Sequence, residues 1–181
     1  MDPSTIQAAR NGHRDAQAEL LRQLQDVWFR LCLSLLGDAG QAREATQETA
    51  LRFLRDLPRF AGKSQLKTWA IGIALNVARE MRREKHALRS HDRSIKPPSP
   101  PLGPLALAEL SEQCDFLRRM LAELPERQRE ALLLRYFEDL SVDDTALAMN
   151  CAAGTVKATV YQALRSLRQK LVADKIGNDV R

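Results

Sequence analysis

Aromatic residues, glycine, cysteine and histidine are all scarce in this sequence. Aromatics make up 5% of the 181 residues, and there are 8 Gly, 3 Cys and 3 His. With so few rings, a core must be built from Leu, Ala, Val and Ile, which the 44% hydrophobic content supplies. Because Ala and Leu favour helices and Gly disfavours them, we expect an all-α fold.

The few cysteines and histidines form no metal-binding pattern. Cys32, Cys114 and Cys151 are far apart and fall on or near apolar helical faces, which predicts free thiols. The histidines share no metal-ligand spacing with them. A glycine-rich phosphate loop and a catalytic triad are also missing. We therefore expect no cofactor, no metal site and no enzymatic activity.

Long apolar segments are absent from the sequence too. No apolar run reaches the roughly 18 residues that a membrane-spanning helix needs. The first residues, MDPSTIQAAR, lack the apolar centre of a secretory signal. The sequence thus predicts a cytoplasmic protein without membrane insertion.

Positive charge is in excess and is unevenly distributed. The formal net charge is +5. Residues 1–89 hold 15 Lys and Arg against 10 Asp and Glu, residues 106–144 hold 5 against 10, and residues 145–181 hold 6 against 2. The first half and the C-terminal segment are therefore the two places where a polyanion would bind. A solvated basic surface is the simpler alternative.

Apolar residues at helical spacing predict four helices before residue 86, at about 4–9, 15–36, 39–57 and 66–83 or beyond. Ser4 is the expected cap of the first. The expected buried side chains are Leu20, Leu24, Val27, Leu31 and Leu35, then Ala42, Ala45, Thr49, Phe53 and Leu57, then Leu66, Ala70, Ile73, Val77 and Met81. The fourth helix is expected to expose Thr68, Gly72, Asn76, Arg79 and Arg83 on its opposite side.

Residues 86–105 interrupt this helical pattern. Five of the eight prolines lie here and large apolar residues are few, which indicates an extended linker. The chain is therefore expected to contain a first domain at 1–88, a linker at 89–105 and a second domain at 106–181. A helix burying Leu107, Leu110, Cys114, Leu117 and Leu121 is expected to open the second domain.

Residues 141–168 have the pattern of a helix-turn-helix. Ser141 can cap a short helix, residues 150–152 break the periodicity, and a second helix follows. Its expected inward side chains are Val156, Val160, Ala163, Leu164, Leu167 and Leu171, and its expected outward ones are Lys157, Thr159, Gln162 and Arg165. In this motif the second helix enters the major groove of DNA. An ordinary helical hairpin is the alternative.

Two series of residues carry a family resemblance. The second half contains, in order, Leu124-Pro125, Arg129, Arg135-Tyr136 and Gly154-Thr155-Val156-Lys157. The first half contains Gln47-Glu48, Phe60, Gly62-Lys63-Ser64, Thr68-Trp69 and the basic stretch 76–83. These series resemble the promoter-binding and promoter-opening domains of bacterial sigma factors, especially those of the extracytoplasmic-function (ECF) type.

The resemblance implies a protein that binds core RNA polymerase, directs it to promoters through their −35 and −10 elements and promotes DNA melting. It implies that the single-stranded −10 element binds Phe60, Lys63, Ser64, Lys67, Trp69, Asn76, Arg79, Arg82 and Arg83. It implies that the duplex −35 element binds Arg135, Thr155, Lys157, Thr159, Gln162 and Arg165. Polymerase docking is assigned in the same way to Asp38, Glu44, Gln47 and Glu48. Family members are commonly held inactive by an anti-sigma protein, so such a partner is implied too.

The recognition helix departs from the family pattern, which often has Ser at Ala152 and Arg at Thr159 and Gln162. We therefore expect the second domain to bind duplex DNA weakly when isolated, because each missing cation is a missing phosphate contact. The main alternative function is a stand-alone helix-turn-helix regulator whose first half serves dimerisation or ligand binding. The residues alone also allow Trp69 to be a core residue and Phe60 to cover the end of the third helix.

Overall fold

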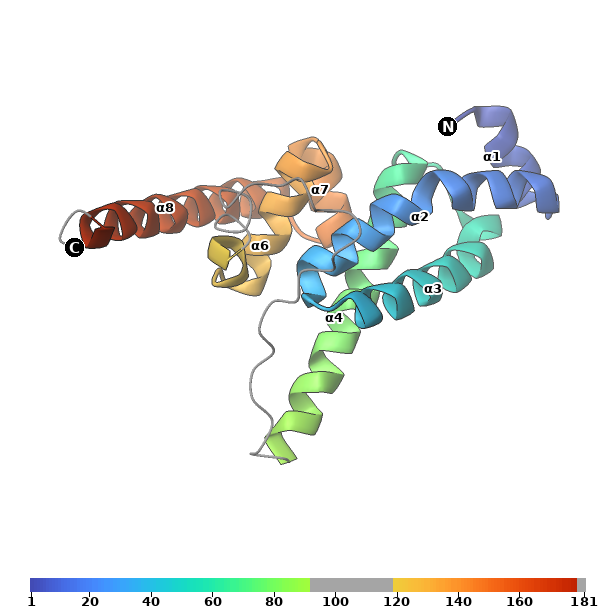
Figure 1. The fold of residues 1–181 in the computed structure, drawn as a ribbon. Helices are drawn as coiled ribbons and strands as arrows, with labels where there is room; N and C mark the ends of the chain where they lie inside the picture. Colours follow the sequence, from blue (N-terminus) through green and yellow to red (C-terminus); the bar gives the residue numbers. More distant parts are fainter. Residues whose placement is uncertain (92–118, 179–181) are drawn as a thin grey trace. The chain divides into compact units, whose positions relative to one another are not determined.

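The computed structural model describes residues 1–91 and 119–178, and the chain divides into two compact units. Unit 1 is residues 1–102 and unit 2 is residues 103–181. Every element within the described ranges is helical, which confirms the all-α prediction (Figure 1). The predicted linker and the helix expected from Leu107 onward lie largely outside the described residues, so the domain boundaries stay predictions.

Unit 1 consists of α1 (Pro3–Arg10), α2 (Arg14–Leu36), α3 (Ala39–Asp56), the short 3-10 helix η1 (Leu57–Arg59) and α4 (Leu66–His91). The helices α2, α3 and α4 pack on one another, and α1 lies against α2 (Figure 1). Asp2, and not Ser4, caps α1, because its carboxylate accepts a hydrogen bond from the Thr5 N–H at 3.1 Å.

Two consecutive residues, Gly37 and Asp38, form the corner between α2 and α3. Gly37 ends α2 in the left-handed conformation, with φ of 71°, and its N–H donates to the Leu33 carbonyl at 2.9 Å. Asp38 then caps α3 by accepting from the Gln41 N–H at 2.8 Å. This tight corner makes α3 return alongside α2.

Trp28 lies at the centre of unit 1 and contacts both neighbouring helices. Its side chain is fully buried. The indole N–H donates to the Ala70 carbonyl of α4 at 3.2 Å, and the ring meets Phe53 of α3 edge-on, with centroids 5.4 Å apart. The prediction that Val27 is the inward residue was wrong, since Val27 is half-buried. Because α2 packs against two helices, its buried face is wider than one stripe.

The helix α4 also packs against two neighbours, which explains why its buried side chains differ from the predicted single stripe. Its interior side chains include Ile71 and Leu75, both fully buried, whereas the predicted Ile73 and Met81 are half-buried. Thr68, predicted to face outward, is only 1% exposed. On α3, by contrast, the predicted set is buried throughout, as Ala42, Ala45, Thr49 and Phe53, and Leu57 follows in η1.

Unit 2 contains α6 (Glu126–Leu132), the π-helical turn η2 (Leu133–Phe137), α7 (Val142–Met149) and α8 (Ala153–Asn178). Its core includes Leu121, Leu124, Leu132 and Ala163, with Val160 and Leu167 packed against them. The predicted inward positions Leu164 and Leu171 are 44% and 42% exposed, so that part of the prediction was wrong. A helix of 26 residues spans about 39 Å, and the short helices α6 and α7 cover only part of it.

Two of the cysteines fall within the described ranges. Cys32 and Cys151 are free thiols, as predicted. Cys32 is buried, and desolvation raises the pKa of its thiol to about 12, whereas Cys151 is half-buried. Cys114 lies outside the described residues. Within residues 1–91 and 119–178, no helix is both long enough and apolar enough to cross a membrane.

Phe53→Ala should lower the free energy of unfolding of unit 1 by about 3–5 kcal/mol, because it leaves a cavity beside Trp28. Both tryptophans of the chain lie in this unit, so their fluorescence during urea unfolding reports on it within the full-length protein. The control is Leu51→Ala on the same helix, which removes a side chain that is 65% exposed and should cost less than about 0.5 kcal/mol. Equal losses for both variants would contradict this packing.

Candidate DNA and protein interfaces

A series of aromatic contacts connects the loop after η1 to the core of unit 1. The ring of Phe60 lies 5.0 Å from that of Trp69, which lies 5.4 Å from Phe53, which in turn contacts Trp28. Phe60 and Trp69 are both half-buried. Trp69 is therefore a packing residue that also keeps part of its surface accessible, and Phe60 is anchored to it.

The loop itself turns at Gly62 and exposes a cation. Gly62 has φ of 68°, a conformation that costs little only for glycine. Lys63 is exposed, Ser64 is half-buried and donates to the Gln65 carbonyl at 3.2 Å, and Lys67 is half-buried at the start of α4. An anion that reaches this loop would meet Lys63 first.

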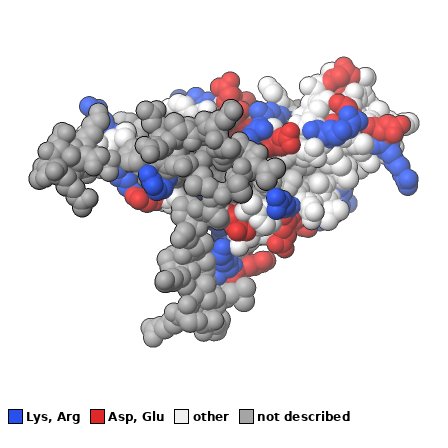
Figure 2. All heavy atoms as spheres, in the orientation of Figure 1, with Lys and Arg blue, Asp and Glu red and all other residues white. Residues whose placement is uncertain are grey.

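One face of α4 presents polar and basic groups next to the loop. Asn76 and Arg83 are exposed, and the half-buried Arg79 donates to the Asn76 amide oxygen at 3.3 Å. Their spacing of three and four residues places them on one side of the helix. Arg82 differs, because it is only 8% exposed and offers little of its guanidinium to a ligand. The visible surface of the described residues intersperses both signs of charge (Figure 2).

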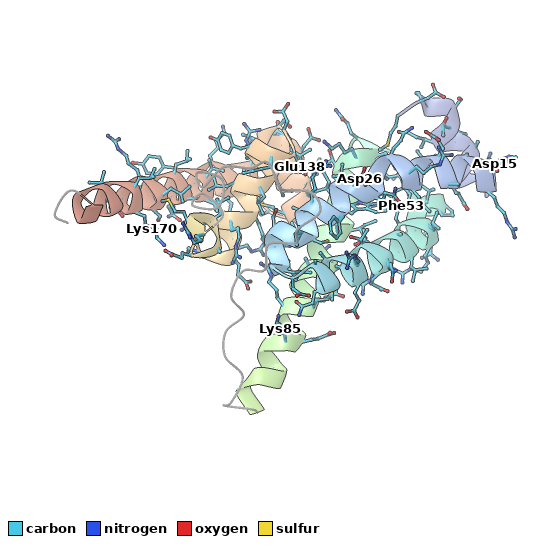
Figure 3. All side chains as sticks on the ribbon, viewed as in Figure 1. Asp15, Asp26, Phe53, Lys85, Glu138 and Lys170 are labelled. Carbon is cyan, nitrogen blue, oxygen red and sulfur yellow. The ribbon has the colours of Figure 1, made fainter. Side chains whose placement is uncertain are left out.

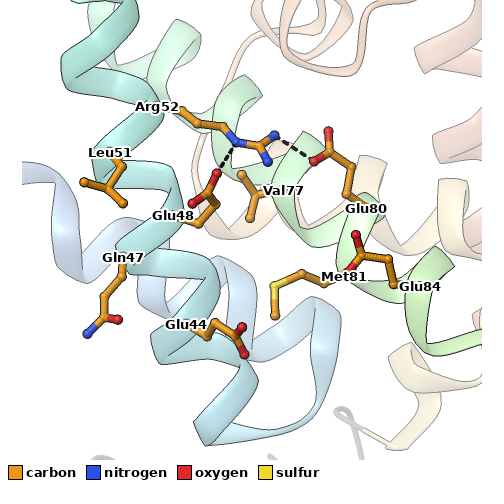
Figure 4. Close-up of a pocket in the computed structure, with 9 residues that line it drawn as sticks. All are labelled: Glu44, Gln47, Glu48, Leu51, Arg52, Val77, Glu80, Met81 and Glu84. Carbon is orange, nitrogen blue, oxygen red and sulfur yellow. Dashed lines mark hydrogen bonds and ion pairs between the residues drawn. The ribbon is translucent and has the colours of Figure 1, made fainter. Parts of the chain in front are cut away.

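A groove of about 330 Å³ lies between α3 and α4 (Figure 4). Its lining residues are Glu44, Gln47, Glu48, Leu51, Arg52, Val77, Glu80, Met81 and Glu84. Arg52 bridges the two helices by pairing with Glu48 at 2.6 Å and with Glu80 at 2.7 Å. These hydrogen bonds, first that to Glu48, raise the pKa of Arg52.

The groove is acidic and also has apolar groups in its lining. Four carboxylates and a single guanidinium line it, so negative charge is in excess, and its apolar side chains are Leu51, which is exposed, Met81, which is half-buried, and Val77, which is buried. Such a surface suits a basic partner that also carries an apolar side chain. No group of three His, Cys, Asp or Glu in the described residues is arranged to hold a metal ion.

The groove joins residues that the sequence analysis singled out to residues that it missed. Glu44, Gln47 and Glu48 line it together, and their role in polymerase docking stays a prediction. Asp38 does not line the groove, since it caps α3. Glu80 and Glu84 were missed because they come from another helix, and no spacing within the sequence links them to α3.

In unit 2 the helix-turn-helix has the predicted corner. Ser141 caps α7, since its Oγ accepts from the Asp144 N–H at 3.0 Å and donates to the Asp144 carboxylate at 2.6 Å. Asn150 ends α7 in the left-handed conformation, with φ of 52°. The Cys151 N–H donates to the Ala146 carbonyl at 3.0 Å, and α8 begins at Ala153.

Arg135 and Arg127 hydrogen-bond to the backbone at the two ends of α7. Arg135 is half-buried and donates to the Leu140 carbonyl, in the loop before α7. Arg127 donates to the Met149 carbonyl at 3.4 Å and lies 3.8 Å from the buried Glu130. Arg135, predicted to contact DNA, thus makes a structural contact, and a DNA contact by it stays a prediction.

The first turns of α8 expose most of the residues assigned to the −35 element. Thr155, Lys157, Gln162 and Arg165 are exposed, whereas Thr159 is half-buried. Tyr161, which is not among the residues predicted to contact the −35 element, is 68% exposed. Because Tyr161 lies four residues after Lys157, which was predicted to face outward, helical spacing alone could have placed it on the same face.

Comparison with known families gives matches in both units. Residues 20–88 match sigma-70 region 2, and residues 117–167 match sigma-70, region 4. The chain is 33% identical to the probable RNA polymerase sigma-C factor of Mycobacterium bovis, over 97% of this chain and 91% of that protein. It is 36% identical to the ECF RNA polymerase sigma factor EcfG of Rhodopseudomonas palustris, over 78% of this chain and 77% of that protein.

Two solved structures of similar fold are complexes with another protein. The sigma factor RpoE in complex with the anti-sigma factor NepR from Bartonella quintana gives a TM-score of 0.74 at 25% identity, over 87% of this chain and 97% of that chain. CnrH, in complex with the cytosolic domain of CnrY, gives a TM-score of 0.71 at 18% identity, over 94% and 96%, and shares the fold.

Asn150→Ala should lower the free energy of unfolding of unit 2 by about 1–2 kcal/mol, because alanine disfavours the left-handed backbone at this corner. Asn150→Gly should stay near the wild type. Far-UV circular dichroism follows the unfolding of both units, while tryptophan fluorescence follows unit 1 alone and should not change. A loss as large for the glycine variant as for the alanine variant would mean that the Asn150 side chain, and not its φ angle, stabilises the corner.

Proposed function

The chain belongs to the sigma-70 family of bacterial RNA polymerase sigma factors, in its ECF group, and we propose that its two units divide promoter opening and promoter recognition between them. A sigma factor directs core RNA polymerase to promoters for transcription initiation, and this is the function of the chain. The observation that carries it is the order of two matches, region 2 followed by region 4, along one chain. A stand-alone regulator with a ligand-binding first half would have no use for region 2.

Docking of polymerase is proposed for the acidic groove between α3 and α4. The support is the lining of the groove, in which the carboxylates of Glu44, Glu48, Glu80 and Glu84 outnumber the one cation, Arg52. Leu51 adds an exposed apolar side chain to the same lining. A basic amphipathic element on the polymerase would bring cations to the carboxylates and an apolar side chain to Leu51. Gln47 adds a neutral hydrogen-bonding group at the same surface.

Binding of the melted −10 element is proposed for the loop after η1 and the polar face of α4. Unstacked bases need an aromatic or flat surface and a cation for the backbone, and stacking contributes about 1–3 kcal/mol per base. Phe60 and Trp69 supply partly exposed rings held by the core, and Lys63, Arg79 and Arg83 supply cations. Ser64, Lys67 and Asn76 add polar groups along the same path.

Binding of the −35 element is proposed for the exposed face of α8, through Thr155, Lys157, Gln162 and Arg165. Two cations on this face give a shallow salt dependence, because each phosphate contact adds roughly −0.9 to the logarithmic slope. Unit 2 alone is therefore proposed to bind duplex weakly. Attachment to polymerase and to unit 1 raises the effective concentration of unit 2 at the promoter.

Regulation by an anti-sigma protein is proposed as well, because the similar RpoE structure is a complex with an anti-sigma factor. We further propose that the chain catalyses no covalent reaction itself and acts in the cytoplasm, where the polymerase of its relatives works. Both statements rest on family membership. The domain limits 1–88, 89–105 and 106–181 belong to this proposal too.

Reversing two charges in the groove, Glu44→Lys with Glu48→Lys, should weaken binding to core RNA polymerase at least about tenfold, because a basic partner would then face like charges. The binding can be measured by fluorescence titration of labelled protein with core enzyme. Asp15→Lys with Asp26→Lys makes the same change in net charge at exposed positions of α2 (Figure 3) and should bind normally. If the two double variants bind alike, the groove is not the docking surface.

Lys63→Ala and Arg79→Ala should each slow promoter opening more than they weaken initial binding of holoenzyme, because their proposed targets become accessible only on melting. Permanganate reactivity of unpaired thymines against time measures opening, and gel-shift titration measures binding. Arg14→Ala removes an exposed cation elsewhere in unit 1 and serves as the control. Wild-type rates of thymine exposure in both variants would rule out this part of the proposal.

A further inference from the structure

Tyr161 is the most exposed large apolar side chain in the described part of the protein, at 68%. It lies on the outward face of α8, one helical turn after Lys157 and one turn before Arg165. Ala158 is exposed three residues before it, and Leu164 is 44% exposed three residues after it. The centre of this face is therefore apolar, and cations flank it on both sides.

This arrangement differs from a surface that reads bases with arginine forks. Thr159 is half-buried and lies two residues from Tyr161, so it points to another side of the helix. Tyr161 is the largest uncharged side chain on the exposed face. In the major groove, an apolar side chain distinguishes thymine by contact with its C5-methyl group. Lys157 and Arg165, both exposed, are placed to meet phosphates on either side.

We propose that Tyr161 is a specificity-determining residue that contacts a thymine methyl group in the −35 element, so that promoters of this factor carry thymine at that position. The proposal rests on the proposed role of α8 in binding duplex DNA. A protein partner at this face is the competing occupant. The flanking cations favour DNA, because they interrupt the apolar surface that a protein interface would continue.

The test uses holoenzyme and promoter fragments that the wild-type holoenzyme selects from fragmented genomic DNA of the source organism. Each thymine of the −35 element is replaced in turn by deoxyuridine, which removes only the methyl group. Wild-type holoenzyme should lose about fourfold in affinity at one thymine, the value expected for one buried methyl group. Tyr161→Ala should bind the thymine probe at least about fourfold more weakly and should not distinguish it from the deoxyuridine probe.

Tyr161→Phe is the conservative variant and should keep the discrimination, because the ring and not the hydroxyl contacts the methyl group. Lys157→Ala and Arg165→Ala test the role of α8 separately. Each should make the logarithmic salt slope shallower by about 0.9 and leave the thymine preference unchanged. Circular dichroism of every variant checks that α8 still folds.

The outcomes distinguish a failure of the proposed role of α8 from a failure of the inference about Tyr161. If none of the three positions affects DNA binding, α8 does not bind the duplex and its proposed role fails. If Lys157→Ala and Arg165→Ala weaken binding while wild type and Tyr161→Ala show the same ratio of thymine to deoxyuridine affinity, the inference about Tyr161 is overturned and the role of α8 stands. If Tyr161→Ala binds DNA normally but loses affinity for core polymerase, the face is a protein interface and the inference is also overturned.

Discussion

The hydrogen bond from the Trp28 indole to the Ala70 carbonyl, with the edge-on contact between Trp28 and Phe53, fixes the arrangement of α2, α3 and α4. A buried indole N–H needs a partner, and a carbonyl on the neighbouring helix restricts how far the two helices can slide. Phe53 also contacts the ring of Trp69, so Trp69 packs against the same cluster. The loop after η1 and the groove between α3 and α4 are thus both positioned by one aromatic cluster.

The two surfaces of unit 1 have opposite chemistry and share α4. One face of that helix carries Asn76, Arg79 and Arg83, while Glu80 and Glu84 contribute to the groove with α3. Arg52 pairs with Glu48 of α3 and with Glu80 of α4, so it links the two helices beside the groove. The face proposed to bind DNA and the groove proposed to bind polymerase therefore share one helix, α4.

Unit 2 depends on a different constraint, the corner at Asn150. The Ser141 cap fixes where α7 begins, and the left-handed residue at its end fixes the direction in which α8 leaves. Arg135 and Arg127 hold the carbonyls of Leu140 and Met149 on either side of α7. These contacts orient the exposed face of α8, on which Tyr161 lies between Lys157 and Arg165.

The sequence by itself determined the helical class, the helix positions, the Ser141 cap, the break at Asn150 and the buried set of α3, because each depends on neighbours within a few residues of the same helix. It also determined the family, because the two series of motifs can be read in their order along the sequence without knowledge of the fold. Tertiary structure alone decided that Trp28 and Leu75 are interior, since helices that contact two partners bury more than one stripe. It alone brought Glu80 and Glu84 to Glu44 and Glu48, and it left Leu164 exposed, because the length of a neighbouring helix and the pairing of distant segments are not encoded in local periodicity.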